Sequence, residues 1–179
     1  MLVLRKIEEI EEEKFHPIYE ESNRENIPFF FPDCRDEQEG LKKVEEGFLS
    51  YLREDFFPRG AVCLIETEGE CWVSAARLYE IEKGKYFLEA LETRPDCRGR
   101  GFGYRLLTHM TEHLCRHGEI EIRTNVASEN QSSLKVHEKA GFLRSGAPAW
   151  NPLLEEEEEG CVEMLYRSQG EAKKSDFPI

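Results

Sequence analysis

The chain has 179 residues, which is enough for one domain with a hydrophobic core and little beyond it. Aspartate and glutamate number 37 against 24 lysines and arginines, and the formal charge of −13 argues against broad nucleic-acid binding, which needs a basic surface. No apolar run is long enough to span a bilayer, and no signal peptide is visible, so we expect a cytoplasmic protein without a membrane partner. The six cysteines are scattered singly, without zinc or redox spacing, which favours reduced thiols and no metal site.

The first third of the chain predicts one strand followed by helices. Residues 2–7 form a short strand candidate, and the acidic stretch over residues 8–22 has helical character that Pro17 interrupts. Residues 26–34 are apolar but carry two prolines, which predicts a loop or a broken helix. In residues 36–54 apolar side chains recur at helical spacing, so we expect a further helix there.

The middle of the chain predicts strands and then a helix. Residues 60–95 contain three extended apolar runs, and the segments TEGE and EKGK between them have the composition of hairpin turns. Further on, Phe102, Leu106 and Met110 recur every four residues, which predicts a helix that ends near Gly118.

The last third predicts a strand, a helix and two closing strands. Residues 119–126 alternate like a strand, and the next helix is expected to begin with a capping box formed by Ser128 and Gln131. Residues 142–150 and 160–168 resemble closing strands, and the run of glutamates between them predicts a solvated loop. The order of elements indicates an α/β fold with antiparallel strands in its middle.

The segment RPDCRGRGFGYRLL, residues 94–107, gathers arginines and glycines where a strand turns into a helix. A glycine-rich turn can point several backbone N–H groups into one hollow, and the helix N-terminus adds the positive end of its dipole. Such a site binds anions, usually phosphate, and arginine suits phosphate geometry. The spacing fits neither a P-loop nor the dinucleotide fingerprint, and a tight turn with solubilising arginines would explain the glycines equally well.

Two motifs decide between these interpretations. The segment RGRGFG, residues 98–103, fits the pattern Arg/Gln-x-x-Gly-x-Gly/Ala, and NQSSLKVHEKAGF, residues 130–142, is similar to Asn-x-x-Ala-x-x-x-Tyr-x-x-x-Gly-Phe. Together they resemble the GNAT superfamily of acyl-CoA-dependent N-acyltransferases, over about residues 85–145. The resemblance implies an α/β fold with a mixed, mostly antiparallel central sheet flanked by helices and with strands splayed around acyl-CoA. We expect a single domain over residues 1–170 and a tail at 171–179.

The resemblance also implies that acetyl-CoA is the co-substrate. Backbone amides of the glycine turn would hold its pyrophosphate, and its pantetheine arm would lie between the splayed strands. The residues expected to bind it are Leu91, Thr93, Arg98, Gly99, Arg100, Gly101, Phe102, Gly103, Asn130 and Ser133. The candidates for outer phosphate contacts are Arg94, Arg100 and Arg105.

Transfer to an amine needs a neutral nucleophile, so a general base is expected. With regular alternation along the strand, Glu89 and Glu92 lie on opposite faces, and the resemblance favours Glu89 as the base. The departing thiolate needs a proton, and the family commonly uses a tyrosine at the position that His137 occupies here. His137 could serve as the acid, relay a proton, hydrogen-bond the sulfur, or simply pack beneath the cofactor.

The acceptor implied by the resemblance is a primary amine of a small molecule, and the acidic composition favours a cationic amine such as a polyamine or an aminoglycoside. A homodimer is left open. Three alternatives also stay open. The first is a catalytically silent acyl-CoA binding or sensing domain on the same fold, and the second is a protein N-terminal or lysine acetyltransferase. The third is an interaction module whose glutamates at 155–159 recruit a basic partner.

Overall fold

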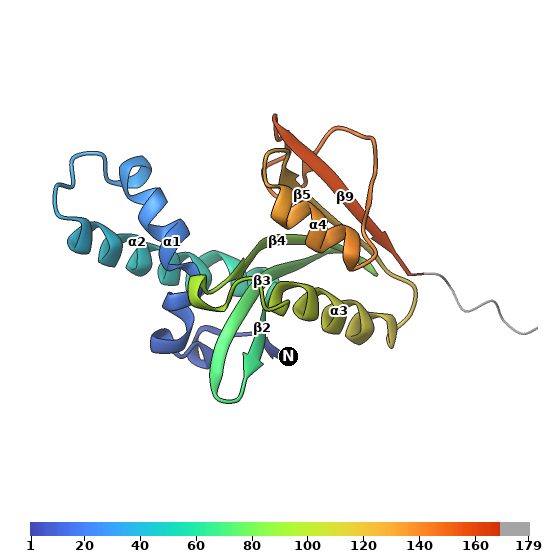
Figure 1. Cartoon of the computed structure of the whole chain (residues 1–179), viewed down its shortest axis with the longest axis horizontal. Helices are drawn as coiled ribbons and strands as arrows, with labels where there is room; N and C mark the ends of the chain where they lie inside the picture. The colour runs from blue at the N-terminus through green and yellow to red at the C-terminus, as the bar shows by residue number, and fades with distance from the viewer. Residues whose placement is uncertain (169–179) are drawn as a thin grey trace, which may run out of the picture.

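The computed structural model describes residues 1–168, which form a seven-stranded sheet with helices on both faces (Figure 1). The strand order is β1-β2-β3-β4-β5-β9-β6, and every neighbouring pair is antiparallel except β4 with β5. This confirms the predicted mixed, mostly antiparallel sheet flanked by helices. The strands are β1 (Leu2–Leu4), β2 (Val62–Glu68), β3 (Cys71–Glu82), β4 (Lys85–Thr93), β5 (Glu121–Ala127), β6 (Leu143–Arg144) and β9 (Cys161–Arg167). The tail predicted at 171–179 lies outside the described residues.

Four α-helices cover the sheet: α1 (Glu12–Phe30), α2 (Glu37–Tyr51), α3 (Phe102–Cys115) and α4 (Gln131–Lys139). The helices α1 and α2 share one hydrophobic core with alternate residues of β2 and β3, and α3 and α4 share a second core with the opposite face of the sheet. Short helical turns complete the chain: η1 (Ile7–Glu9), the π-helix η2 (Leu52–Phe56), η3 (Phe57–Arg59) and η4 (Pro95–Cys97). In Figure 1, α1 and α2 extend to the left of the sheet, away from α4, β5 and β9.

The predicted break of the first helix at Pro17 is wrong. The prediction of a loop or a broken helix over residues 26–34 is wrong for residues 26–30, which belong to α1, and holds for residues 31–34, which follow the end of the helix. Helix α1 runs through Pro17 and Pro28 without interruption. A proline inside a helix removes one hydrogen bond and costs about 3 kcal/mol. Phe15 and Ile18, on either side of Pro17, are completely buried, and each contributes about 1.5–3 kcal/mol. Burial of this face therefore outweighs the local cost of the proline.

The glutamate run is solvated, as its composition predicts, but it is not entirely a loop. A second, two-stranded sheet pairs β7 (Trp150–Asn151) with β8 (Glu156–Glu157) inside this segment. Glu158 accepts hydrogen bonds from Asn151 Nδ2 at 2.7 Å and from Asn125 Nδ2 at 2.8 Å. The segment is therefore fastened to β5 by a specific carboxylate, which composition alone cannot indicate.

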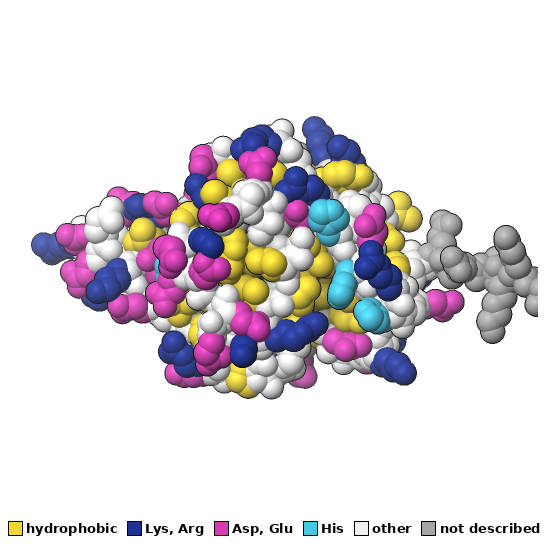
Figure 2. Space-filling view, turned by 90° about the horizontal axis from the view of Figure 1, so that it is seen from below, with side chains coloured by type: hydrophobic (Ala, Val, Ile, Leu, Met, Phe, Trp, Pro, Cys, Tyr) yellow, Lys and Arg dark blue, Asp and Glu magenta, His cyan; other side chains and the backbone are white. Residues whose placement is uncertain are grey.

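The surface is charged with both signs. On the face shown in Figure 2, lysine and arginine side chains lie among aspartate and glutamate side chains, with hydrophobic side chains between them. Within residues 1–168, no helix is long and apolar enough to cross a bilayer. The same residues bring no three histidine, cysteine, aspartate or glutamate side chains together as metal ligands, and all six cysteines are free thiols.

Candidate active site

The turn between β4 and α3 is shaped for an anion. Gly99 and Gly101 have φ angles of +74° and +83°, in the left-handed region that other residues adopt only at a cost. Gly101 is the N-cap of α3 and offers no side-chain cap, which leaves N–H groups of the first turn without a capping acceptor. A Cβ added at either glycine would meet no atom within 4 Å. The turn therefore presents N–H groups and the positive end of the helix dipole to open space.

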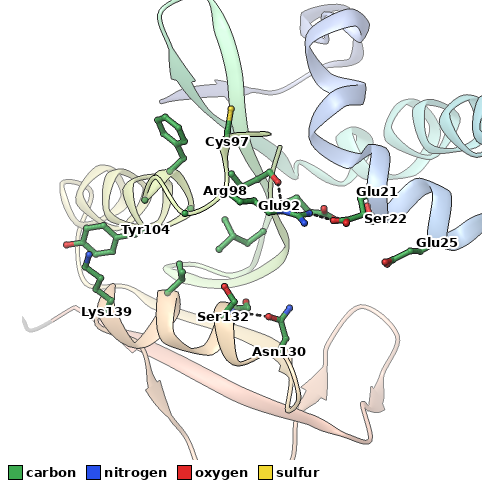
Figure 3. Close-up of a pocket in the computed structure, with 18 residues that line it drawn as sticks. Glu21, Ser22, Glu25, Glu92, Cys97, Arg98, Tyr104, Asn130, Ser132 and Lys139 are labelled. Atoms are coloured by element: carbon green, nitrogen blue, oxygen red, sulfur yellow. Dashed lines mark hydrogen bonds and ion pairs between the residues drawn. The ribbon is translucent and has the colours of Figure 1, made fainter. Parts of the chain in front are cut away.

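This turn borders a cavity of about 630 Å³ (Figure 3). The end of β4, the start of α3, one side of α4 and the middle of α1 all contribute to its walls. All of the residues predicted to bind acetyl-CoA except Arg100 line it: Leu91, Thr93, Arg98, Gly99, Gly101, Phe102, Gly103, Asn130 and Ser133. Residues that are far apart in the sequence thus meet around one continuous space.

The arginines of the turn are held by carboxylates. Arg100 donates to Glu68 at 2.6 and 2.8 Å, Arg105 donates to the buried Glu66 at 2.7 Å, and Arg94 donates to Asp96 at 2.8 and 3.0 Å. None of these three side chains lines the cavity. The side chains of the three candidates for outer phosphate contacts therefore lie outside the lining of the cavity, each paired with a carboxylate.

Arg98 is the arginine that the cavity does include. Its guanidinium forms an ion pair with Glu21 of α1, and its Nε donates to the carbonyl of Thr93 at 3.2 Å. A second cation, Lys139 at the end of α4, lies 4.4 Å from the ring centre of Tyr104 at the start of α3. Figure 3 shows Lys139 and Tyr104 at one end of the cavity and Glu21 at the other.

Strands β4 and β5 separate beside the cavity. They pair in parallel only where residues 85–87 of β4 lie opposite residues 121–123 of β5. Beyond this point the two strands have no paired residues within the described part of the chain, although β4 continues to Thr93 and β5 to Ala127. The predicted splay of these strands is thus present.

A bulge in β4 changes which side chains share a face. The register with β3 sets Glu89 opposite Arg77 and Glu92 opposite Ala75, so residues 90–91 of β4 have no partner in it. Ala90 takes a φ of +48°, as a bulged residue can. Because Arg77 and Ala75 lie two residues apart on β3, Glu89 and Glu92 lie on the same face of the sheet. The prediction that they lie on opposite faces is wrong, since regular alternation fails at the bulge.

Glu89 is a half-buried carboxylate near one arginine. Burial raises the pKa of Glu89 and the charge of Glu158 adds to the rise, while Arg77 and the hydroxyl of Tyr79 oppose it. The carboxylate lies 3.6 Å from Arg77 Nε. A carboxylate with a raised pKa is a better proton acceptor than an ordinary one, which suits a general base.

Glu92 lines the cavity directly, and Glu89 does not. Burial raises the pKa of Glu92 too, against the Ser22 hydroxyl and the positive charge of Arg98. Figure 3 shows Glu92 facing Glu21 and Ser22 of α1 across this end of the cavity, with Glu25 beyond them. Sequence reasoning missed these α1 residues, because nothing in the spacing of an acidic helix indicates which of its carboxylates faces a cavity.

The start of α4 is organised by Asn130. Its Oδ1 accepts the N–H of Ser133 at 3.0 Å, which makes Asn130 the N-cap of the helix. The predicted capping box from Ser128 is wrong, since Gln131 Nε2 instead donates to the carbonyl of Ser128 at 2.8 Å. Asn130 and Ser133 both line the cavity, so the cap also sets the position of α4 against it.

His137 is 1% exposed and does not line the cavity. Its Nδ1 lies 2.8 Å from the carbonyl of Ser133, which can only accept, so Nδ1 carries the proton. Nε2 is then unprotonated, and it has no partner among the described residues. Burial lowers the pKa of His137, and its ring packs edge-on against Phe142. In this state the one ring proton of His137 is on Nδ1 and faces the Ser133 carbonyl, so Nε2 has none to give to a leaving group.

Comparison with known proteins places this geometry in a wider context. A family model described as the acetyltransferase (GNAT) family matches residues 15–142. No curated protein matches the sequence. Among solved structures, the PaiA N-acetyltransferase of Thermoplasma acidophilum in complex with coenzyme A shares 16% identity at a TM-score of 0.60, over 93% of this chain and 98% of that one.

Two further structures share the fold. YncA, a putative acetyltransferase from Salmonella typhimurium with acetyl-CoA, is 16% identical at a TM-score of 0.55, over 98% of both chains. An aminoglycoside 6′-acetyltransferase of type Ii is 14% identical at a TM-score of 0.57, over 93% of this chain and 96% of that one. With the family model covering most of its length, and with the glycine turn and splayed strands around one cavity, this chain belongs to the GNAT family of acetyltransferases.

Proposed function

We propose that the protein is an N-acetyltransferase that moves an acetyl group from acetyl-CoA to a primary amine of a small molecule. The cavity supports this most directly, because it joins an anion-binding turn to the stretch of β4 that lacks strand partners. A phosphate-bearing cofactor with a long polar arm matches both ends of that space.

The residues present fit acetyl-CoA. Its pyrophosphate would accept hydrogen bonds from the backbone of residues 98–103, and Lys139 would supply a positive charge at the same end. Leu91 and Thr93 would offer main-chain groups to the pantetheine arm. When bound, acetyl-CoA supplies the thioester carbonyl that the amine attacks. Residues 90–91 have no partner residue in β3 or β5, and their N–H groups are the candidates to hydrogen-bond that carbonyl.

Glu89 is the proposed general base. It lies next to the bulge at Ala90, and 23% of its side chain remains exposed, so it can take a proton from an incoming ammonium directly or through water. Glu92 instead lies between the Ser22 hydroxyl and the charge of Arg98, and we assign it to attracting the acceptor. Direct attack with a base needs no nucleophile of the protein.

His137 is proposed to hold α4 in place and not to act as the general acid. Its proton is committed to the Ser133 carbonyl, and burial keeps the ring neutral. Coenzyme A thiol has an intrinsic acidity that lets it depart as a thiolate, and solvent can then protonate it. Deprotonation of the incoming ammonium therefore needs a protein group more than protonation of the departing thiolate does.

The test is coenzyme A release from acetyl-CoA, followed with a thiol reagent, across polyamines, aminoglycosides, amino acids and peptide N-termini. We expect release that depends on one class of small amine and that is lost in Glu89→Gln. Binding of acetyl-CoA without release from any amine would favour a silent acyl-CoA binding domain. Release with peptides alone would favour a protein acetyltransferase.

A further inference from the structure

Arg77 stands in an aromatic setting beside the proposed base. It projects from β3 on the face covered by α1 and α2, directly opposite Glu89 in the register. Its guanidinium lies over the ring of Phe48 at 5.3 Å and over the ring of Tyr51 at 5.8 Å, both from α2. We call Arg77, Glu89, Phe48 and Tyr51 the Arg77 cluster. Stacking against two rings fixes the plane of a guanidinium without using its N–H groups.

The side chain of Arg77 donates no hydrogen bond within the described residues. Among residues 1–168 no group accepts a hydrogen bond from its side chain, and the buried Nε has no partner. Glu89 is nearest at 3.6 Å, which is too long for a hydrogen bond. The side chain is 19% exposed, so it is not completely shielded from solvent, although it does not line the cavity beside β4. Glu89 is within ion-pair distance but accepts no hydrogen bond, so the guanidinium keeps donors that can bind a planar anion.

Helix α1 supplies two more unsatisfied donors on the same side of the sheet. The hydroxyl of Tyr19 and the Nδ2 of Asn23 are buried without a hydrogen-bond partner in the described part of the chain, and the two residues are 3% and 5% exposed. They lie four residues apart and so share one face of the helix. The ring of Tyr19 packs edge-on against Phe48, which also touches Arg77. What this region lacks is an acceptor, because buried donors normally find one.

We propose that the Arg77 cluster binds a carboxylate of the acceptor, so that the substrate is an amine carrying a carboxylate on the adjacent carbon, as in an α-amino acid. This deepens the proposed function and rests on it. The carboxylate would accept from Arg77 and Tyr19, and the amine would face Glu89 beside the bulge. Arg77 and Glu89 are side by side, as are the two charged groups of such a zwitterion.

Charge complementarity favours this class over the alternatives. A polyamine would bring positive charge against Arg77, and a simple anion would bring negative charge against Glu89. A zwitterion meets an opposite charge at each point, which fixes its orientation as well as its binding. The Arg77 cluster therefore favours a zwitterionic amine over the polyamines and aminoglycosides that the acidic composition suggests.

Matched pairs of acceptors test the proposal. Each α-amino acid is compared with the amine that lacks only its carboxylate: phenylalanine with phenethylamine, methionine with 3-(methylthio)propylamine, lysine with cadaverine, and arginine with agmatine. We expect kcat/KM for coenzyme A release to be about 10- to 100-fold higher for the carboxylated member of the pairs that are used. Equal or better release with the decarboxylated members, or no release with any amino acid, would overturn the proposal.

Variants test whether Arg77 is the residue that binds the carboxylate of the acceptor. Arg77→Gln is expected to remove the preference by slowing only the carboxylated member of a pair, whereas a folding defect would slow both. Arg144→Gln, an exposed arginine paired with Glu138, is the matched control and should keep the preference. Equal losses for both members of a pair in Arg77→Gln would contradict a binding role.

Tyr19→Phe provides a second variant that does not risk the fold. The hydroxyl has no partner to lose, so the midpoint of thermal unfolding should stay the same or rise. If the hydroxyl helps to bind the carboxylate, kcat/KM for the amino acid should fall while that for its decarboxylated partner does not. Binding of acetyl-CoA and release with plain amines would survive failure of this inference, so its failure is distinguishable from failure of the proposed function.

Discussion

Glu89 and Glu92 share a face of β4 and both have a raised pKa, so the roles proposed for them can be separated by kinetics. A base must be unprotonated to act, so kcat/KM should rise with pH through the pKa of Glu89. Glu89→Gln is expected to lower kcat/KM by about 10²–10⁴-fold and to abolish this rise. The measurement is a pH profile of coenzyme A release with one acceptor.

Glu92→Gln is the matched control, since it makes the same change three residues away on the same face. It should raise KM for the amine and leave the acid limb of the profile in place. A profile that loses this limb in Glu92→Gln and keeps it in Glu89→Gln would exchange the two roles.

His137 gives a prediction about stability. Burial lowers its pKa in the folded state below the ordinary value of about 6.5. Between the lowered pKa and 6.5 the unfolded chain binds more protons, so the contribution of His137 to stability is complete above 6.5 and is lost as pH falls. His137→Phe should therefore show a smaller drop in the free energy of unfolding from pH 7 to pH 5 than the wild type. Parallel curves from denaturant titrations would contradict this.

At the scale of residues, the sequence predicted correctly which residues line the cavity when their position depends on the local backbone. Leu91, Thr93 and the glycine turn belong to a continuous segment, and all of them but Arg100 line the cavity. Glu21, Ser22 and Glu25 reach the cavity from α1, about seventy residues earlier in the chain. Ala90 also gives no local sign of its left-handed conformation, because residues with a Cβ rarely adopt one.

Among the elements, the turn before α3 can be tested against another turn of the same kind. Gly101 and Gly60 have φ angles of +83° and +79°, and an added Cβ meets nothing within 4 Å at either. Gly101→Glu and Gly60→Glu thus introduce the same strain, about 1–2 kcal/mol, and the same charge. Only Gly101→Glu should weaken acetyl-CoA binding, by tenfold or more, because it puts a carboxylate at the anion site.

Calorimetric titration of both variants with acetyl-CoA gives the comparison. Similar affinity in the two would mean that the turn does not hold the phosphates. If the two variants lose the same unfolding free energy but differ in their affinity for acetyl-CoA, the loss of binding in Gly101→Glu is not caused by backbone strain.

Elements with strong local patterns agreed with prediction, and those decided by distant contacts did not. The two hairpins of β2, β3 and β4 follow from turns with clear composition. Helix α1 continues through Pro17 because its buried face packs on the sheet, and the glutamate run is fixed because Asn125 and Asn151 bond Glu158. Neither cause is visible within the segment concerned.

At the scale of the whole molecule, the sheet consists of two parts that meet over a short distance. Strands β1 to β4 form one part, and β5, β9 and β6 form the other. The direct pairing between them is the three-residue match of residues 85–87 with 121–123. The cavity takes its walls from both parts, with β4 and the glycine turn on one side and α4 on the other. A ligand that fills it would connect them.

This arrangement predicts how acetyl-CoA changes hydrogen exchange across the molecule. At 100 times its Kd the ligand should raise the free energy of unfolding by about 2.7 kcal/mol. Exchange should slow further at residues 91–93, at residues 98–103 and in the first turn of α4, where both parts would contact it. Strand β1 borders no part of this cavity, so it reports the global effect alone. Adenosine 3′,5′-diphosphate lacks the pantetheine arm and should protect the turn without residues 91–93. Protection confined to the turn with acetyl-CoA as well would mean that the arm does not lie between β4 and α4.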